Sequence, residues 1–256
     1  GARHTTTARP PPHIILVLAD DIGPSDVGYG ADAALAQTVR TPTLDALAHA
    51  GVRLSRFYSA PDCTPARAAL LTGRHAVRSG CAGRWPTGGV FPKTALGGLP
   101  DDEVTFAEAL RDRGGYRTAL VGKWHLGQRP ERMPTRHGFD TFWGLPYSCD
   151  NGGSAWTSKV SWPPLPTLAN ETIIEQPSDL STLTARLARE SARFVRDAHA
   201  AGAPWALYLP FAPTHTPTFC SPAYCTSAKR GRCGRRAGER RLSLSLSLRP
   251  TTSAAT

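Results

Sequence analysis

Residues 63–74 read CTPARAALLTGR, and this stretch predicts a helix that begins close to Cys63. Pro65 suits the first turn of a helix, because its missing N–H would have no partner there in any case. The apolar residues after Arg67 provide a face for packing, and Gly73 is typical of a helix end. Cys63 has two interpretations, because a lone cysteine is most often a buried thiol, whereas a helix N-terminus favours anionic ligands.

Apolar runs elsewhere in the chain predict the sheet on which this helix packs. Residues 13–19, HIILVLA, show no polar alternation, so we expect a strand that is buried on both faces of a parallel sheet. Residues 52–58 predict a strand that leads directly into Cys63. Further strands are expected over residues 116–121 and 205–211, helices over 41–51, 103–113 and 180–200, and loops over 82–102 and 150–178. The fold class is therefore α/β, with a mostly parallel, mixed sheet flanked by helices.

Polar residues follow three of these strands. Asp20 and Asp21 come directly after the first strand, and ligand sites of open α/β sheets lie at such carboxyl ends. Two adjacent carboxylates are costly without a partner, so the pair indicates either a metal ion or a capped turn. Lys123 and His125 follow the strand at 116–121, and His215 follows the strand at 205–211. Each of these three residues is also compatible with an exposed loop.

Two motifs together resemble a known family. The pattern Cys-x-Pro-x-Arg followed by Leu-Thr-Gly-Arg, at residues 63–74, is similar to the first signature of the sulfatases. Residues 115–125, with Gly122-Lys123 and His125 in place, are similar to the second. The resemblance is to the arylsulfatase A type and runs from about residue 13 to residue 232. It implies an alkaline-phosphatase-like fold, of which this chain carries the N-terminal part, roughly the first half of a full sulfatase.

The resemblance also implies a role for each candidate residue. Cys63 would be oxidised in the endoplasmic reticulum by the formylglycine-generating enzyme to Cα-formylglycine, the catalytic aldehyde. Calcium or magnesium would be bound by Asp20, Asp21 and residue 63. The other catalytic residues would be Arg67, Lys123 and His125, and the residues that bind the sulfate ester would be Ser148 and His215. Ala66 stands where the family usually has serine, so we expect a less complete conversion of Cys63.

We therefore predict a hydrolase of sulfate monoesters that depends on formylglycine and a divalent cation. Two alternatives stay open: a phosphonate or phosphomonoester hydrolase of the same superfamily, and a truncated, non-catalytic sulfatase-like product. The resemblance implies an Asp-Asn pair and a further lysine beyond residue 232, and the sequence has neither there. We accordingly expect the chain as written to bind metal weakly and to turn over little substrate.

The composition changes at both ends of the chain. Residues 1–12 predict a flexible lead-in, residues 13–232 an incomplete catalytic domain, and residues 233–256 a low-complexity basic tail that is disordered or frame-shifted. The Leu-Ser alternation at 242–248 also fits an amphipathic strand. Eight Lys or Arg and one Glu in residues 229–256 account for +7 of the net charge of +10. Because the remainder is weakly charged, we predict no nucleic-acid-binding face.

Other features concern the cellular compartment. The six cysteines show no CxxC pair and no zinc-type spacing, and their number is compatible with one or two disulfides. Asn170-Glu171-Thr172 is an N-glycosylation sequon, which predicts glycosylation of Asn170 and passage through the secretory pathway, to the lysosome or the cell exterior. No stretch reaches the length of a transmembrane helix, and no signal peptide is visible.

Overall fold

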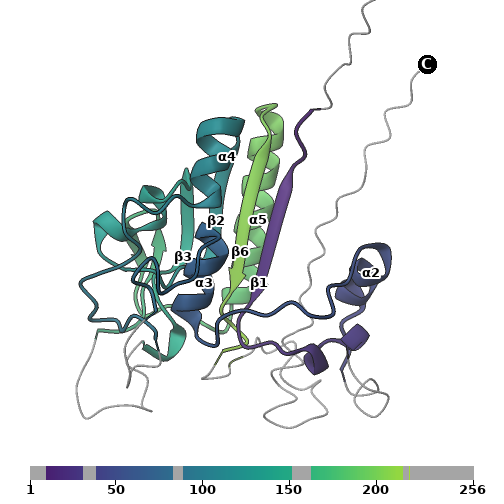
Figure 1. Ribbon diagram of the computed structural model, residues 1–256, viewed down its shortest axis with the longest axis horizontal. Coiled ribbons are helices and arrows are strands. Elements are labelled where there is room, and N and C mark those ends of the chain that lie inside the picture. The colour runs from purple at the N-terminus through teal and green to yellow at the C-terminus, as the bar shows by residue number, and fades with distance from the viewer. Residues whose placement is uncertain (1–9, 31–38, 83–88, 152–162, 216–218, 220–256) are drawn as a thin grey trace, which may run out of the picture.

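The computed structural model of the chain describes residues 10–30, 39–82, 89–151, 163–215 and 219. Its centre is a six-stranded mixed sheet with helices on both faces (Figure 1). The strands, in their order across the sheet, are β1 (Ile14–Ala19), β6 (Trp205–Phe211), β2 (Arg117–Lys123), β3 (Thr141–Leu145), β4 (Thr167–Ala169) and β5 (Thr172–Glu175). The first four are parallel, and β4 pairs antiparallel with both β3 and β5, which confirms the predicted α/β class.

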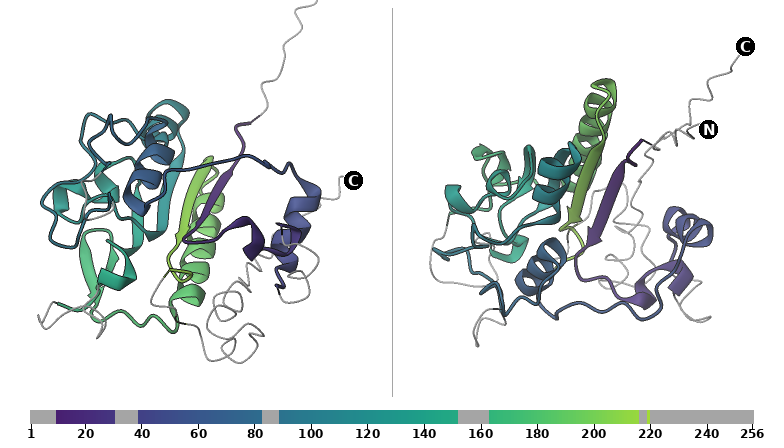
Figure 2. Two further views of the ribbon diagram at one scale, coloured as in Figure 1. Left: turned by 60° about the horizontal axis from the view of Figure 1, so that its bottom comes forward. Right: turned by 45° about the horizontal axis from the view of Figure 1, so that its top comes forward.

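Four α-helices and five short 3-10 helices are assigned among the described residues. The α-helices are α2 (Pro42–Ala50), α3 (Cys63–Thr72), α4 (Phe106–Gly114) and α5 (Leu183–Ala200). The 3-10 helices are η1 (Pro24–Asp26), η2 (Gly28–Gly30), η3 (Pro130–Arg132), η4 (Pro134–Arg136) and η5 (Cys149–Asn151). Figure 2 shows α5 on one face of the sheet, α3 and α4 on the other, and α2 well away from it.

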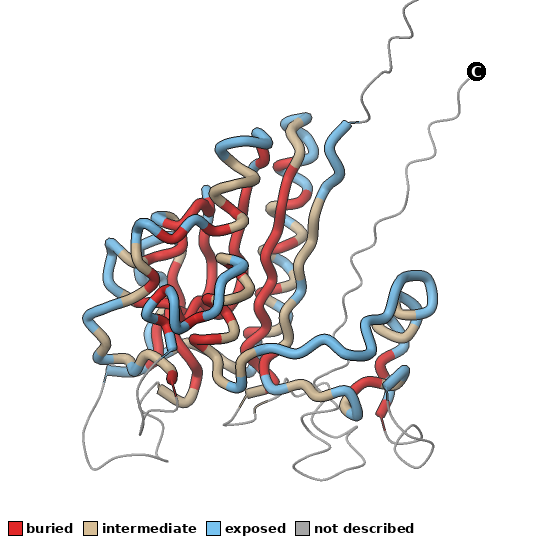
Figure 3. The backbone as a smooth tube through the Cα atoms, viewed as in Figure 1, coloured by how far each residue is buried: buried red, intermediate tan, exposed pale blue. Residues whose placement is uncertain are grey.

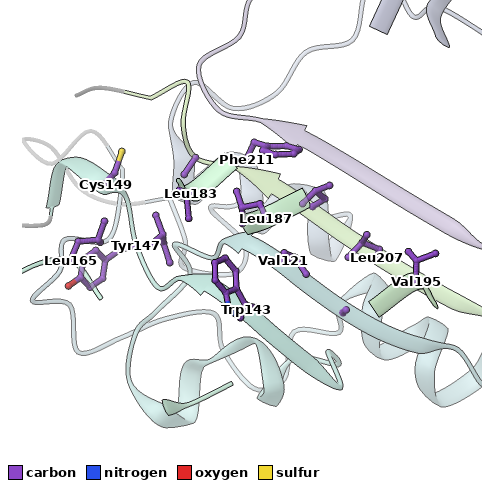
Figure 4. Close-up of a cluster of buried hydrophobic side chains, with 14 of the residues drawn as sticks. Val121, Trp143, Tyr147, Cys149, Leu165, Leu183, Leu187, Val195, Leu207 and Phe211 are labelled. Atoms are coloured by element: carbon purple, nitrogen blue, oxygen red, sulfur yellow. The ribbon is translucent and has the colours of Figure 1, made fainter. Parts of the chain in front are cut away.

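Alternate residues of the central strands belong to two separate hydrophobic cores. Leu207 and Leu209 of β6 pack with Leu187 and Val195 of α5 in the first core (Figure 4). Tyr208, on the opposite face of the same strand, belongs to the second core, with residues of α3 and α4. Because both faces are covered, β2 and β6 are almost wholly buried (Figure 3). This two-sided burial is the reason that β6 reads as a continuous apolar run, whereas β2 has a shorter apolar stretch, Ala119–Val121.

The strand predicted at residues 13–19 forms as β1, but its predicted burial on both faces is wrong. β1 pairs only with β6 among the described strands and lies at the edge of the described sheet. Its residues are mostly half-buried, and Val17 is 40% exposed. An apolar run therefore marks a parallel strand here without marking a central one.

The strand predicted at residues 52–58 is absent. This segment runs as an irregular connection from α2 to α3 (Figure 1), and Val52, Phe57 and Tyr58 are 91%, 71% and 85% exposed. A strand needs a partner to satisfy its backbone, and no described strand lies beside this segment. β-branched and aromatic composition alone therefore misled the assignment.

The loop predicted at residues 150–178 contains η5 and the hairpin β4–β5. Asn170, in the turn of the hairpin, has φ 54°, a left-handed conformation that asparagine tolerates well. Its Oδ1 accepts a hydrogen bond of 2.9 Å from the N–H of Phe142, and its own N–H donates to the Phe142 carbonyl over 2.7 Å. An asparagine before the run Thr172–Ile174 is a turn signal that the sequence analysis did not use.

The predicted helices form with small shifts at their ends. α4 begins three residues later than expected, at the point where Thr105 and Glu108 form a reciprocal capping box. α3 begins at Cys63 and ends at Gly73, whose φ of 67° is the left-handed cap that glycine favours. α5 begins three residues after the predicted start. α2 forms as predicted, but it buries none of its residues.

Gly122 lies at the closest approach of β2 to β6, and we expect its replacement by alanine to destabilise the fold. Its φ is 145°, and an added Cβ would overlap the backbone carbonyl of Pro210. Steric overlap and backbone strain together should lower the free energy of unfolding by about 3 kcal/mol. Urea unfolding measures this loss. Gly97→Ala is the matched control, since its Cβ would meet no atom within 4 Å; equal midpoints for the two variants would contradict the prediction.

His137 makes the stability depend on pH. It is fully buried beside Trp124, neither ring nitrogen has a hydrogen-bond partner among the described residues, and burial lowers its pKa. Below pH ~6.5 the unfolded chain therefore binds more protons than the folded chain. The part of the stability that depends on a neutral His137 is complete above that pH and is lost on acidification. His137→Phe should lose less stability than the parent between pH 7 and pH 5. Urea unfolding at the two pH values tests this, and equal losses would rule it out.

Candidate active site

The carboxyl ends of three parallel strands and the N-terminus of α3 meet at one edge of the sheet (Figures 1 and 2). Asp20 follows β1, Lys123 is the last residue of β2, and Cys63 is the first residue of α3. His215 lies four residues beyond the end of β6. Four segments far apart in the sequence thus deliver polar side chains to one place, as the parallel topology requires.

Asp20 lies at the centre of this group and is 7% exposed. Arg67 donates from Nη2 to its Oδ1 over 2.9 Å, and Lys123 donates from Nζ to its Oδ2 over 2.6 Å. Burial alone would raise the pKa of Asp20, but the charges of Arg67 and Lys123 outweigh that effect and hold the pKa well below its ordinary value. Asp20 is therefore a carboxylate at any pH at which the protein would work.

Cys63 contacts two members of this group, Lys123 and Asp20. Its Sγ lies 3.3 Å from Lys123 Nζ and 3.9 Å from Asp20 Oδ1. Arg67, one turn along α3, also donates from Nη1 to the backbone carbonyl of Lys123 over 2.8 Å. A single lysine and a single arginine therefore tie α3 to the ends of β1 and β2. Position 63 faces positive charge, which suits chemistry on an anion.

His125 is 2% exposed and has the positive φ of 64°. Its Nε2 lies 3.0 Å from the carbonyl oxygen of Phe91, and because a carbonyl only accepts, Nε2 carries the proton. Nδ1 then holds the lone pair, and it has no hydrogen-bond partner among the described residues. Burial and the charges of Lys123 and Arg67 lower the pKa of His125 well below its usual value, so the ring is neutral and able to accept a proton.

Asp21, His215 and Ser148 form the outer part of the site. Asp21 has φ 52°, and its side chain is 45% exposed. His215 Nε2 lies 3.8 Å from Asp21 Oδ2, and His215 Nδ1 lies 3.5 Å from Ser148 Oγ. His215 thus joins the β1 end to the segment after β3. The structure places every catalytic, substrate and metal residue predicted from the sequence at this edge of the sheet.

Sequence reasoning missed the residues that support this group. Thr214 donates its hydroxyl to the backbone carbonyl of Asp20, and Thr64 donates to the carbonyl of His125 over 2.9 Å. Thr64 Oγ1 also accepts from the N–H of Phe91 over 3.1 Å, so it holds the loop that orients the His125 ring. A buried threonine carries no signal that separates it from ordinary core residues.

A cleft of about 360 Å³ opens beside Asp20 and Cys63, a size within the range of ligand-binding pockets. It is lined by residues 18–23, 59–63, Ala66 and Arg67. The lining therefore includes Asp20 and Asp21, which follow β1, and the start of α3. A small anionic ester could therefore reach residue 63 from solvent.

The donor atoms fit a hard divalent cation once residue 63 offers oxygen. Ligand atoms of Asp20, Cys63 and His215 lie within 4.8 Å of one another, and Asp21 is next to them in the cleft. Carboxylate oxygens suit calcium and magnesium, whereas a thiol sulfur does not. Each Asp20 oxygen already accepts one hydrogen bond, but a carboxylate oxygen has a second lone pair for a cation.

The sulfatase family model matches residues 12–246. The chain belongs to the sulfatase family. It is 40% identical over 245 residues to arylsulfatase A of Bos taurus, covering 89% of this chain and 46% of that protein. It is 37% identical over 240 residues to arylsulfatase G of Mus musculus, covering 84% and 43%. The crystal structure of the PsFucS1 sulfatase from Pseudoalteromonas sp. has a TM-score of 0.75 at 29% identity and covers 90% of this chain and 50% of that one.

The chain spans less than half the length of the curated sulfatases it matches. Among its described residues, no helix is long and apolar enough to cross a membrane.

Several predicted features lie outside the described residues. They are the basic tail at 233–256, the lead-in over 1–9 and the cysteines at 220, 225 and 233. Cys63 and Cys81 are free thiols.

Proposed function

We propose that this sulfatase chain carries the catalytic centre for hydrolysis of sulfate monoesters, through formylglycine made from Cys63 and with calcium or magnesium. One observation carries the proposal: Lys123 and Arg67 converge on Asp20 and residue 63 in a cleft. A sulfate ester is an anion that repels nucleophiles, so its site must neutralise charge beside the attacking group. The relatives named arylsulfatases support the same substrate class.

Each side chain has a role that its environment allows. Lys123 contacts residue 63 and would also bind the sulfate, while Arg67 holds Asp20 and would orient the hydroxyls of residue 63. Ser148 and His215 would bind the ester oxygens. The cation, when bound by Asp20, Asp21 and an oxygen of residue 63, supplies positive charge that polarises the ester.

The proposed reaction uses the two hydroxyls of the hydrated aldehyde at residue 63. One hydroxyl gives its proton to water in the cleft and attacks sulfur, the bond from sulfur to the alcohol oxygen breaks, and His215 gives that oxygen a proton that it regains from solvent. His125, which is neutral, takes the proton of the second hydroxyl. The bond from carbon to the sulfate oxygen then breaks, sulfate leaves, and the aldehyde forms again. A thiol or a serine at position 63 would lack this route of release.

The remaining proposals concern the route of the protein through the cell. The formylglycine-generating enzyme is the proposed partner, and the secretory pathway, leading to the lysosome or the exterior, is the proposed location. The exposed turn at Asn170 supports glycosylation, since its Oδ1 is engaged in the hairpin and no described residue hydrogen-bonds its Nδ2. Loss of a glycosidase-sensitive mobility shift in Asn170→Gln, expressed in secretory cells, tests this.

The test of function is a comparison of substrates on fully converted protein. The 256-residue chain is co-expressed with the formylglycine-generating enzyme, the aldehyde is quantified, and aryl sulfate, aryl phosphate and aryl phosphonate are compared with calcium or magnesium present. We expect a preference for sulfate at a rate below the ~1–10³ s⁻¹ typical of enzymes. A preference for phosphonate or phosphate would favour the superfamily alternative. No hydrolysis at full conversion would favour the non-catalytic product.

A further inference from the structure

Tyr208 is a large polar side chain that is buried in the second core. It lies in the middle of β6, between Leu16 of β1 and Leu120 of β2, and it is 1% exposed. Its ring packs between Phe106 and Phe139, with centroid distances of 6.1 and 6.2 Å. Phenylalanine would fill this aromatic slot equally well, so packing alone does not account for the hydroxyl.

The Arg67 guanidinium has one side that its known partners do not occupy. Nη1 donates to the carbonyl of Lys123 and Nη2 to Asp20, but Nε makes no regular hydrogen bond with a described residue. The hydroxyl of Tyr208 is in the same position, being buried without a regular partner. Burial of two such groups side by side would be costly if they did not interact, because each has lost its water.

The side chains of Tyr208 and Arg67 are close enough to interact, and both the charge of Arg67 and a side-chain hydrogen bond with it act on the pKa of Tyr208. Burial raises the pKa of Tyr208 to about 12 although the charge of Arg67 acts against that rise, and the charge interaction is mutual. The hydroxyl is therefore neutral and keeps lone pairs that can accept from Nε–H.

We propose that Tyr208 is a positioning residue, whose hydroxyl accepts from Arg67 Nε–H and completes the contacts that hold the guanidinium against Asp20. In this arrangement the Arg67 guanidinium, carried by α3, is held by the carbonyl of Lys123 at the end of β2, by Asp20 directly after β1 and by Tyr208 of β6. The catalytic consequence rests on the proposed function, because Arg67 and Asp20 act on residue 63. The contact itself does not, so it can be tested separately.

The test observes the Arg67 Nε–H directly, by NMR of the full chain labelled with 15N-arginine. Arg67→Lys assigns the resonance. We expect hydrogen exchange at Arg67 Nε–H to be ~10-fold faster in Tyr208→Phe than in the parent. Tyr116→Phe is the matched control: it also removes the hydroxyl of a buried tyrosine, which lies directly before β2 and donates to Pro12 instead, and it should leave Arg67 unchanged.

Two further readouts keep the proposal falsifiable. In the parent protein we expect a nuclear Overhauser effect between Arg67 Hε and the Tyr208 ring protons beside the hydroxyl, which requires no variant to fold. Its absence, or equal Arg67 exchange in both tyrosine variants, would overturn the proposal. In converted protein that hydrolyses aryl sulfate, Tyr208→Phe should lower kcat ~10-fold and change KM less. A parent without hydrolysis would count against the proposed function and leave the NMR result to decide the contact.

Discussion

Asp20→Asn is expected to destabilise the protein by about 3–5 kcal/mol, because it removes the only described negative charge that pairs with the buried Arg67 and Lys123. Both cations are almost completely buried, with side-chain exposures of 1% and 0%. Asparagine matches the shape of aspartate and can still accept a hydrogen bond, so the loss reports charge rather than packing. Urea unfolding at pH 7 measures it.

Asp21→Asn is the matched control for this variant. Asp21 is the neighbouring carboxylate, its side chain is 45% exposed, and its ion-pair partner among the described residues is His215, at 3.8 Å. An exposed pair of this kind contributes about 0–1 kcal/mol, so this variant should unfold close to the parent. Equal losses for the two variants would show that burial and pairing of Asp20 do not matter as argued.

The pH dependence of the same variant checks the sign of the argument. Arg67 and Lys123 hold the pKa of Asp20 far below its value in the unfolded chain, which is ~3.9. A lowered folded-state pKa means that the stabilisation is complete above the unfolded value and is lost as the pH falls below it. The difference between parent and Asp20→Asn should therefore be constant from pH 5 to 7 and shrink below pH ~4.

Local patterns predicted the elements whose covering neighbours the structure describes. β6 is covered on both faces and its apolar run identified it, and the amphipathic pattern identified α4 to within three residues of its start. Residues 52–58 have strand composition but no described partner, and composition cannot supply the missing hydrogen bonds. The burial of β1 failed for a related reason, since its position at the edge depends on pairing and not on its own residues.

The site was predictable where residue type and position in a motif were enough. Cys63, Lys123 and the aspartate pair each stand at the end of a predicted strand or the start of a predicted helix, and parallel topology brings such ends together. Thr64, Thr214 and Tyr208 were not found. Thr64 and Thr214 hydrogen-bond to residues that lie 61 and 194 positions away in the sequence, and Tyr208 packs against rings that are also distant in the sequence. Only the folded chain shows such contacts.

Cys63→Ala should abolish hydrolysis, on the order of 10³-fold or more for loss of a nucleophile, and leave stability nearly unchanged. Cys63 is half-buried, and its sulfur is held only by the contacts to Lys123 and Asp20, which remain bonded to each other without it. The measurement pairs aryl sulfate hydrolysis with labelling of the aldehyde by a hydrazide probe after co-expression with the formylglycine-generating enzyme. Both signals should disappear together.

Cys81→Ala separates this chemical effect from the general loss of a thiol. Cys81 is fully buried in the second core, beneath α3, and burial raises its pKa, so it is an inert thiol. Its replacement should lower the free energy of unfolding by about 1–2 kcal/mol and leave the aldehyde and the rate per folded molecule intact. Aldehyde labelling that survives in Cys63→Ala, or vanishes in Cys81→Ala, would place the modified residue elsewhere and remove the basis of the proposed reaction.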